Sequence, residues 1–240
     1  MKLDILALAA HPDDIELSCS GTLIRHAEAG KKVGIVDFTQ GELGTRGTPE
    51  LRLQEAEEAG KRMRLSARVN LGFADGFFKN DLEHQMELIK QIRKYKPEIV
   101  FANALTDRHP DHGRAARLSI EACFLSGLKK VATELDGEAQ EAWRPKKIFH
   151  YIQSTYIEPD FVVDVTEQWK KKTLAIEAFE SQFHVKESGS LGDQTFISTP
   201  EFMQFISSRA RSWGQSVGVK YAEGFTTHQA LGLNNLFDLI

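Results

Sequence analysis

The first half of the chain alternates short apolar runs with longer segments of helical period. The apolar runs are typical of strands covered on both faces, and they span residues 3–9, 33–38, 68–72 and 98–102. The segments of helical period span residues 21–29, 48–64, 81–96 and 113–126. This alternation predicts an α/β fold, a mostly parallel sheet with helices on both faces.

The second half is less regular. Residues 147–152 and 161–165 have the pattern of strands, and residues 166–179 and 200–212 that of helices. Residues 186–199 are rich in Ser, Gly and Asp and predict a flexible loop. No internal repeat or linker divides the chain. We therefore expect one domain over residues 1–240, with a core of about 1–185 and a C-terminal extension of about 186–240.

Composition restricts the class of partner. The net charge of −4 and the pI of about 6.1 argue against nucleic acid or an acidic membrane as a partner, which leaves a small molecule or a second copy of the chain. No apolar run approaches the roughly 20 residues of a membrane-spanning helix. Cys19 and Cys123 lie in apolar surroundings, as buried thiols of a reducing compartment do. We expect a cytoplasmic protein.

Residues 10–16, Ala-His-Pro-Asp-Asp-Ile-Glu, directly follow the first predicted strand. In open α/β sheets ligands bind beyond the carboxyl ends of strands. Ionisable side chains crowded there need a compensating charge, which a divalent cation supplies. His11 and Asp14 are three residues apart on a turn, so they can converge on one metal ion.

Residues 107–112, Asp-Arg-His-Pro-Asp-His, follow the fourth predicted strand in the same way. In the common strand order 3-2-1-4-5 the first and fourth strands are neighbours, so both segments would face one crevice. Two histidines and one carboxylate from these segments suit Zn²⁺ with an open position for water. The same set suits non-haem Fe²⁺.

Three further side chains are placed for catalytic roles. Zinc lowers the pKa of bound water to about 7, and Asp13 is placed to take the proton from that water. His109 is placed to polarise a carbonyl group or to protonate a departing amine. Asp111 is placed to orient His109 and stabilise its charge.

Both segments resemble the signatures of the LmbE-like (PIG-L) zinc-dependent N-deacetylases. The similarity continues through residues 41–48 with Arg52 and Glu55, and through residues 181–183 and 217–225. It covers most of the chain. Within the family, the sequence is most similar to the branch that deacetylates N-acetylglucosaminyl-malate in bacillithiol biosynthesis.

The resemblance implies a Rossmann-like fold and a concrete site. By matching positions, His11, Asp14 and His112 are the zinc ligands. Asp13 is the general base for attack of zinc-bound water on the acetyl carbonyl, and His109 assists with Asp111 behind it. The products would be acetate and a glucosamine conjugate. Bacillithiol-type relatives form hexamers, so the resemblance also implies a homo-oligomer.

Substrate recognition follows from the malate group of that substrate. Malate carries two carboxylates, and arginine binds a carboxylate through two parallel hydrogen bonds. The candidates are Arg46, Arg52, Arg108, Arg209 and Arg211. An arginine on a helix, such as Arg209, usually faces solvent or forms a surface ion pair. We therefore select Arg52 and Arg108 as substrate-binding residues.

Other functions fit parts of this pattern. Within the family, the substrate could be another N-acetyl amino sugar, such as a chitin oligosaccharide, or a thiol conjugate cleaved by an amidase. An iron-dependent oxygenase would use the same types of ligand. A nucleotide- or sugar-binding module with structural histidines would carry no turnover.

Overall fold

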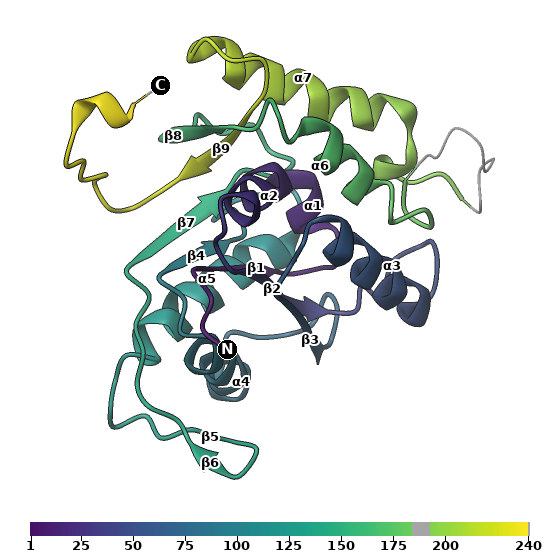
Figure 1. Cartoon of the computed structure of the whole chain (residues 1–240). Coiled ribbons are helices and arrows are strands. Elements are labelled where there is room, and N and C mark those ends of the chain that lie inside the picture. Colours follow the sequence, from purple (N-terminus) through teal and green to yellow (C-terminus); the bar gives the residue numbers. More distant parts are fainter. Residues whose placement is uncertain (184–192, 240) are drawn as a thin grey trace.

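The computed structural model describes residues 1–183 and 193–239. Seven strands of this described part form one twisted sheet in the order β3-β2-β1-β4-β7-β9-β8 (Figure 1). Their bounds are Ile5–Ala9 (β1), Val33–Thr39 (β2), Ala67–Phe73 (β3), Ile99–Ala102 (β4), Lys147–Tyr151 (β7), Phe161–Asp164 (β8) and Ala222–Thr226 (β9). A small hairpin of β5 (Glu134–Leu135) and β6 (Glu138–Ala139) stands apart from this sheet.

The strands from β3 to β7 pair in parallel, with β1 at the centre. Ile5 of β1 lies opposite Val33 of β2 on one side and Ile99 of β4 on the other. The predicted strand order is therefore confirmed for the five parallel strands, with β7 as the fifth. The ends of β1 and β4 lie side by side.

The helices cover both faces of the sheet, as predicted (Figure 1). They are α1 (Asp14–Ser18), α2 (Ser20–Glu28), α3 (Pro49–Arg62), α4 (Leu82–Tyr95), α5 (Pro110–Leu125), α6 (Trp169–Ile176) and α7 (Pro200–Ser216). Successive side chains of β1 point to opposite faces. Leu6 and Leu8 accordingly pack with α4 and α5, whereas Ile5 and Ala7 pack with α1, α2 and α6.

Local sequence accounts for several helix ends. The Thr48 side chain accepts a hydrogen bond from the Leu51 N–H, which fixes the start of α3 where it was predicted. The helix predicted from residue 113 begins earlier, at Pro110. Pro110 has no N–H to lose at a first helical position. Residues 110–112 of the second histidine segment are therefore the first turn of a helix, and residues 107–109 lead into it.

Strand β9 was not predicted from the sequence. It lies between β7 and β8 and runs antiparallel to both, with Phe225 opposite Phe161. Glu223 and Gly224 lower the strand propensity of this short segment. Residues 222–226, which we placed in the C-terminal extension, thus contribute a strand to the central sheet.

The loop predicted over residues 186–199 falls partly outside the described residues, at 186–192. In its described part, Phe196–Ser198 form a short 3₁₀ helix, η1, directly before α7; a second, η2 (Leu236–Asp238), lies near the C-terminus. Both cysteines are buried, Cys19 fully and Cys123 nearly so. None of the helices in the described residues combines the length and the apolar character that spanning a bilayer requires.

Candidate active site

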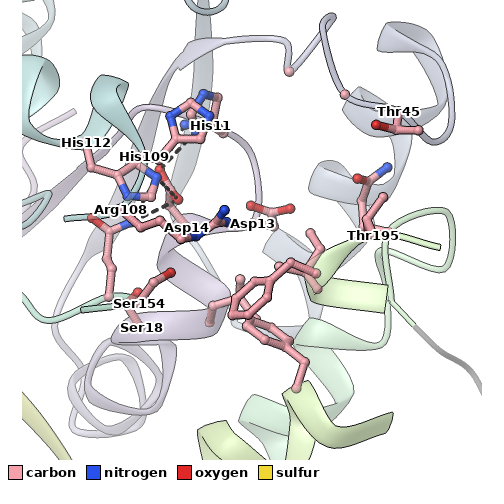
Figure 2. A pocket seen from close by; sticks show the side chains of 18 of the residues that line it. His11, Asp13, Asp14, Ser18, Thr45, Arg108, His109, His112, Ser154 and Thr195 are labelled. Atoms are coloured by element: carbon pink, nitrogen blue, oxygen red, sulfur yellow. Dashed lines mark hydrogen bonds and ion pairs between the residues drawn. The ribbon is translucent and has the colours of Figure 1, made fainter. Parts of the chain in front are cut away.

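Residues of both histidine segments line one pocket (Figure 2). This pocket lies beyond the carboxyl ends of β1 and β4. Its volume of about 380 Å³ is in the range of small-molecule sites. The walls are contributed by the start of α1, the loop 41–45, the first turn of α5, η1 and α7. The two segments that sequence analysis placed in one crevice therefore do share one.

Asp14 is at the centre of the polar cluster in this pocket. Its Oδ2 accepts hydrogen bonds from the backbone N–H of His11 and from Asn103 Nδ2, both at 3.0 Å. Its Oδ1 accepts one from Gln153 Nε2 at 3.0 Å and lies 3.1 Å from His112 Nε2. Burial opposes ionisation of this carboxyl, but the neighbouring His112 and His11 hold its pKa well below the usual range.

Each histidine that faces Asp14 has its other ring nitrogen on a carboxylate. His11 Nε2 lies 2.9 Å from Asp75 Oδ1 and 3.3 Å from Asp111 Oδ2. His112 Nδ1 lies 2.6 Å from Asp107 Oδ2. Burial lowers the pKa of His112, but Asp14 and Asp107 outweigh it and raise that pKa to about 9. A carboxylate on the far nitrogen is the usual way in which proteins orient a metal-binding histidine.

Two distances around Asp14 are close to the separation of ligand atoms on a divalent cation. A tetrahedral ion with bonds of about 2.1 Å holds its ligand atoms about 3.4 Å apart. Asp14 Oδ1 lies 3.1 Å from His112 Nε2, and Asp14 Oδ2 lies 3.7 Å from His11 Nδ1, on either side of that value. Two imidazole nitrogens and a carboxylate are donors that both Zn²⁺ and Fe²⁺ accept.

In the described part of the chain, two groupings bring potential ligand atoms within 4.8 Å of one another, and neither contains Asp14. One combines His11 with His109 and His112, and the other combines His11 with Asp75 and Asp111. In the second grouping, however, His11 Nε2 and Asp75 Oδ1 are at hydrogen-bonding distance, 2.9 Å. The pair with Asp75 orients the His11 imidazole so that Nδ1 faces Asp14.

His109 completes the group of three histidines that Figure 2 shows together. Its ring centroid is 4.7 Å from that of His11 and 5.1 Å from that of His112. Burial, together with the neighbouring His11 and His112, lowers the pKa of His109. Its Nδ1 accepts the backbone N–H of Asp111 at 3.3 Å, so a neutral ring carries its proton on Nε2.

The Asp111 side chain contacts different groups from those we expected. Its Oδ2 accepts the Gly76 N–H at 2.8 Å and lies near His11, and its Oδ1 pairs with Arg114. In the described residues the Asp111 carboxylate makes no hydrogen bond to His109. Because His109 is the N-cap of α5, it is the backbone of Asp111 that orients the ring.

Asp13 occupies a strained position between β1 and α1, with a φ of 105°. Such left-handed geometry at a non-glycine residue costs about 1–3 kcal/mol and is found mostly at functional sites. Arg52 Nη2 donates a hydrogen bond to Asp13 Oδ2 at 2.5 Å. Burial raises the pKa of Asp13 to about 6, although Arg52 acts in the opposite direction. A carboxylate with such a pKa is a suitable general base near neutral pH.

Comparison with known proteins places this chain in a family. The model of the family described as PIG-L, GlcNAc-PI de-N-acetylase, matches residues 6–123. An uncharacterized deacetylase, YaiS, of Escherichia coli is 35% identical over 63% of this chain and 83% of its own length. The chain belongs to the PIG-L family of de-N-acetylases.

Two other similarities extend over most of the chain. The structure of the conserved protein TT1542 of Thermus thermophilus is 36% identical, covers 97% of this chain and 98% of its own, and superimposes with a TM-score of 0.85. The diacetylchitobiose deacetylase of Thermococcus kodakarensis is 27% identical over 92% of this chain and 81% of its own. The resemblance seen in the two histidine segments thus extends to a deacetylase family and its fold.

The other segments in which this chain resembles PIG-L proteins contact one another and support one wall of the pocket. Ser181 donates to the buried Glu55 through its N–H and its hydroxyl, both at 2.7 Å. Gln182 Nε2 donates to the Arg46 carbonyl at 2.7 Å. These bonds dock the end of the 41–48 loop on residues that follow α6, next to α3.

The candidate arginines differ in their surroundings. Arg52 is engaged by Asp13, and Arg108 lines the pocket with its guanidinium 4.6 Å from the Phe196 ring centroid. Arg211 is exposed and donates to the Tyr221 hydroxyl. Arg209 is buried and lines the pocket, so the expectation that it faces solvent is wrong. The helix period places it on the inner face of α7.

Sequence reasoning missed three polar residues of this site, Asp75, Asn103 and Gln153, and gave no role to Asp107 of the second segment. Asn103 follows β4 directly, Asp107 lies in the same connection, and Asp75 and Gln153 each come two residues after a parallel strand. Polar residues beyond the carboxyl ends of parallel strands are themselves a signal. Applied to every strand, the rule that identified His11 would also have found these four.

Proposed function

We propose that this chain is a metal-dependent hydrolase that removes the N-acetyl group from N-acetylglucosaminyl-malate in bacillithiol biosynthesis. The observation that carries the proposal is the convergence of Asp13, His109 and the donors around Asp14 in one pocket. We assign His11, Asp14 and His112 as the ligands of Zn²⁺, or of Fe²⁺ in the same set. When bound, such an ion acidifies a water molecule and polarises the acyl oxygen.

The chain's own residues supply the proton transfers. Asp13 takes the proton of the attacking water, and Arg52 holds the carboxylate in place for this. His109, with Nε2–H available, donates a hydrogen bond to the oxygen on which negative charge develops. The amide C–N bond then breaks, and Asp13 or His109 protonates the departing amine. Acetate and a glucosamine conjugate leave.

Two other substrate classes remain the alternatives within this chemistry. The similarity to the diacetylchitobiose deacetylase supports a chitin oligosaccharide or another N-acetyl amino sugar, and a thiol conjugate would be cleaved by the same amide hydrolysis. We also propose a cytoplasmic homo-oligomer, a hexamer, on the basis of the family resemblance. Light scattering on the purified protein tests the oligomer.

The decisive experiment measures release of primary amine by protein loaded with a known metal. N-acetylglucosaminyl-malate, N-acetylglucosamine and diacetylchitobiose are compared at equal concentrations. We expect the malate conjugate to have the highest kcat/KM, and we expect chelator-treated protein to regain activity when Zn²⁺ or Fe²⁺ is added. Activity on the other two sugars alone would reject the pathway, and no release from any of them would reject the acyl-amide substrate class.

The replacement of Gly41 by alanine is expected to disturb Asp13 indirectly. Gly41 has a φ of +68°, and a Cβ there would lie 2.8 Å from Arg52 Nη1. Displacing Arg52 misplaces the base, so kcat/KM for amine release should fall about 10- to 100-fold. Gly72→Ala is the matched control, because Gly72 has a φ of +65° but open space around its Cβ position. Equal losses of activity in both variants would reject this role of Arg52.

A further inference from the structure

One wall of the pocket is a stripe of side chains on α7: Phe202, Phe205, Ile206 and Arg209. Their spacing of three and four residues places them on one face of the helix. The first three are apolar, and the fourth carries a guanidinium group. We refer to these four residues as the α7 stripe.

Within residues 1–183 and 193–239, no carboxylate pairs with the buried guanidinium of Arg209. Arg209 is only 7% exposed, and its Nη1 has no hydrogen-bond partner in the described part of the chain. Burial lowers the pKa of Arg209 to about 10, so the group is still charged at neutral pH. The two carboxylates whose charge reaches it are bonded elsewhere, Glu223 to Lys172 at 2.7 Å and Asp107 to His112 at 2.6 Å.

Two aromatic rings hold this guanidinium. Its central carbon lies 5.3 Å from the Phe205 ring centroid and 5.2 Å from that of Trp213. Aromatic faces interact with the plane of a guanidinium but do not satisfy its N–H donors. A buried charge with unsatisfied donors is unfavourable, and a carboxylate that accepts two parallel hydrogen bonds removes this penalty.

A second guanidinium lies along the same wall. Arg108 covers the Phe196 ring, and Phe196 packs edge-to-face on Phe202 of the α7 stripe with 5.4 Å between ring centroids. Unlike Arg209, Arg108 is exposed. The wall therefore offers one preorganised buried cation and one adaptable cation at the surface, which suits a ligand with more than one carboxylate.

We propose that Arg209 is a specificity-determining residue, which binds a carboxylate on the group attached to the amino sugar. This inference rests on the proposed function, because it assigns the substrate class of the same pocket: N-acyl amino sugars with an anionic aglycone. Neutral sugars leave Arg209 unpaired and bind less well.

The first test compares Arg209→Gln with wild type in the amine-release assay. For N-acetylglucosaminyl-malate we expect KM to rise about 10- to 100-fold with kcat little changed, because a charge-assisted hydrogen bond is lost in both ground and transition states. For diacetylchitobiose we expect no change in either constant. Arg211→Gln, two residues along α7 and outside the pocket lining, should behave as wild type on both substrates.

A binding measurement separates this proposal from the proposed function. Calorimetry with L-malate and with acetate on the metal-loaded protein needs no turnover. We expect Arg209→Gln to weaken binding of L-malate at least 10-fold, Arg209→Lys to retain part of it, and acetate, which also reaches the metal site, to bind all three proteins alike. If wild type releases no amine but this difference holds, the deacetylase assignment is wrong and the anion subsite stands.

Two results would overturn the subsite. One is equal binding of L-malate by wild type and Arg209→Gln. The other is a lowered Tm of Arg209→Gln together with equal losses on the anionic and the neutral substrate, which would make Arg209 a structural residue. We expect its Tm to be unchanged or higher, because an unpaired buried charge has been removed.

Discussion

Asp13→Asn is expected to lower kcat for amine release by about 10²- to 10⁴-fold while the protein keeps its metal. An amide at this position still accepts the hydrogen bond from Arg52, but it cannot take a proton from water. Asp13 contacts Arg52 and the start of α1, whereas Asn103 and Gln153 hold the carboxylate of Asp14. The loss should therefore be confined to the chemical step.

His112→Ala is the counterpart of this variant, because it should abolish both turnover and metal content. Elemental analysis and kcat are measured on the same preparations. Asp136→Asn is the matched control for Asp13→Asn. Like Asp13, Asp136 has a positive φ, 55°, but it lies in the exposed turn between β5 and β6. If Asp13→Asn lost the metal while Asp14→Asn kept it, the roles we assign to these two carboxylates would be reversed.

Lys172→Met is expected to lower the free energy of unfolding by about 3–5 kcal/mol, because it leaves a buried carboxylate without its countercharge. Lys172 is 1% exposed and Glu223 is 2% exposed, and Lys172 Nζ lies 2.7 Å from Glu223 Oε1. Glu223 also accepts the N–H groups of Gly21 and Thr22, so the pair joins α6, α2 and β9.

Urea unfolding at equilibrium measures this effect. Lys171→Met is the matched control, since Lys171 is exposed and pairs with Glu28 at the surface, where such a pair contributes about 0–1 kcal/mol. The double variant Lys172→Met/Glu223→Gln should recover part of the loss, because no unpaired charge remains. Similar losses for Lys171→Met and Lys172→Met would contradict the importance of this buried pair.

Sequence patterns were enough to predict the parallel part of the sheet and the pocket that holds the candidate site. Both depend on local patterns: buried strands have continuous apolar runs, helices have a period of 3.6 residues, and binding residues follow the carboxyl ends of strands. His11, Asp14 and His112 lie within three residues of such strand or helix ends, so the neighbouring positions of β1 and β4 were sufficient to bring them together.

The packing of distant segments sets which partner each supporting residue contacts and how charge is distributed around the site. Asp75 on His11, Asp107 on His112 and Gln153 on Asp14 are contacts that no local pattern encodes. The same is true of β9, which is short and polar but is stabilised by its place between two strands. For Arg209, the helix period predicts a face of α7 but not what that face covers. Burial depends on the packing of distant segments, which no local pattern encodes. This packing makes Arg209 a buried cation in the pocket and not a surface residue.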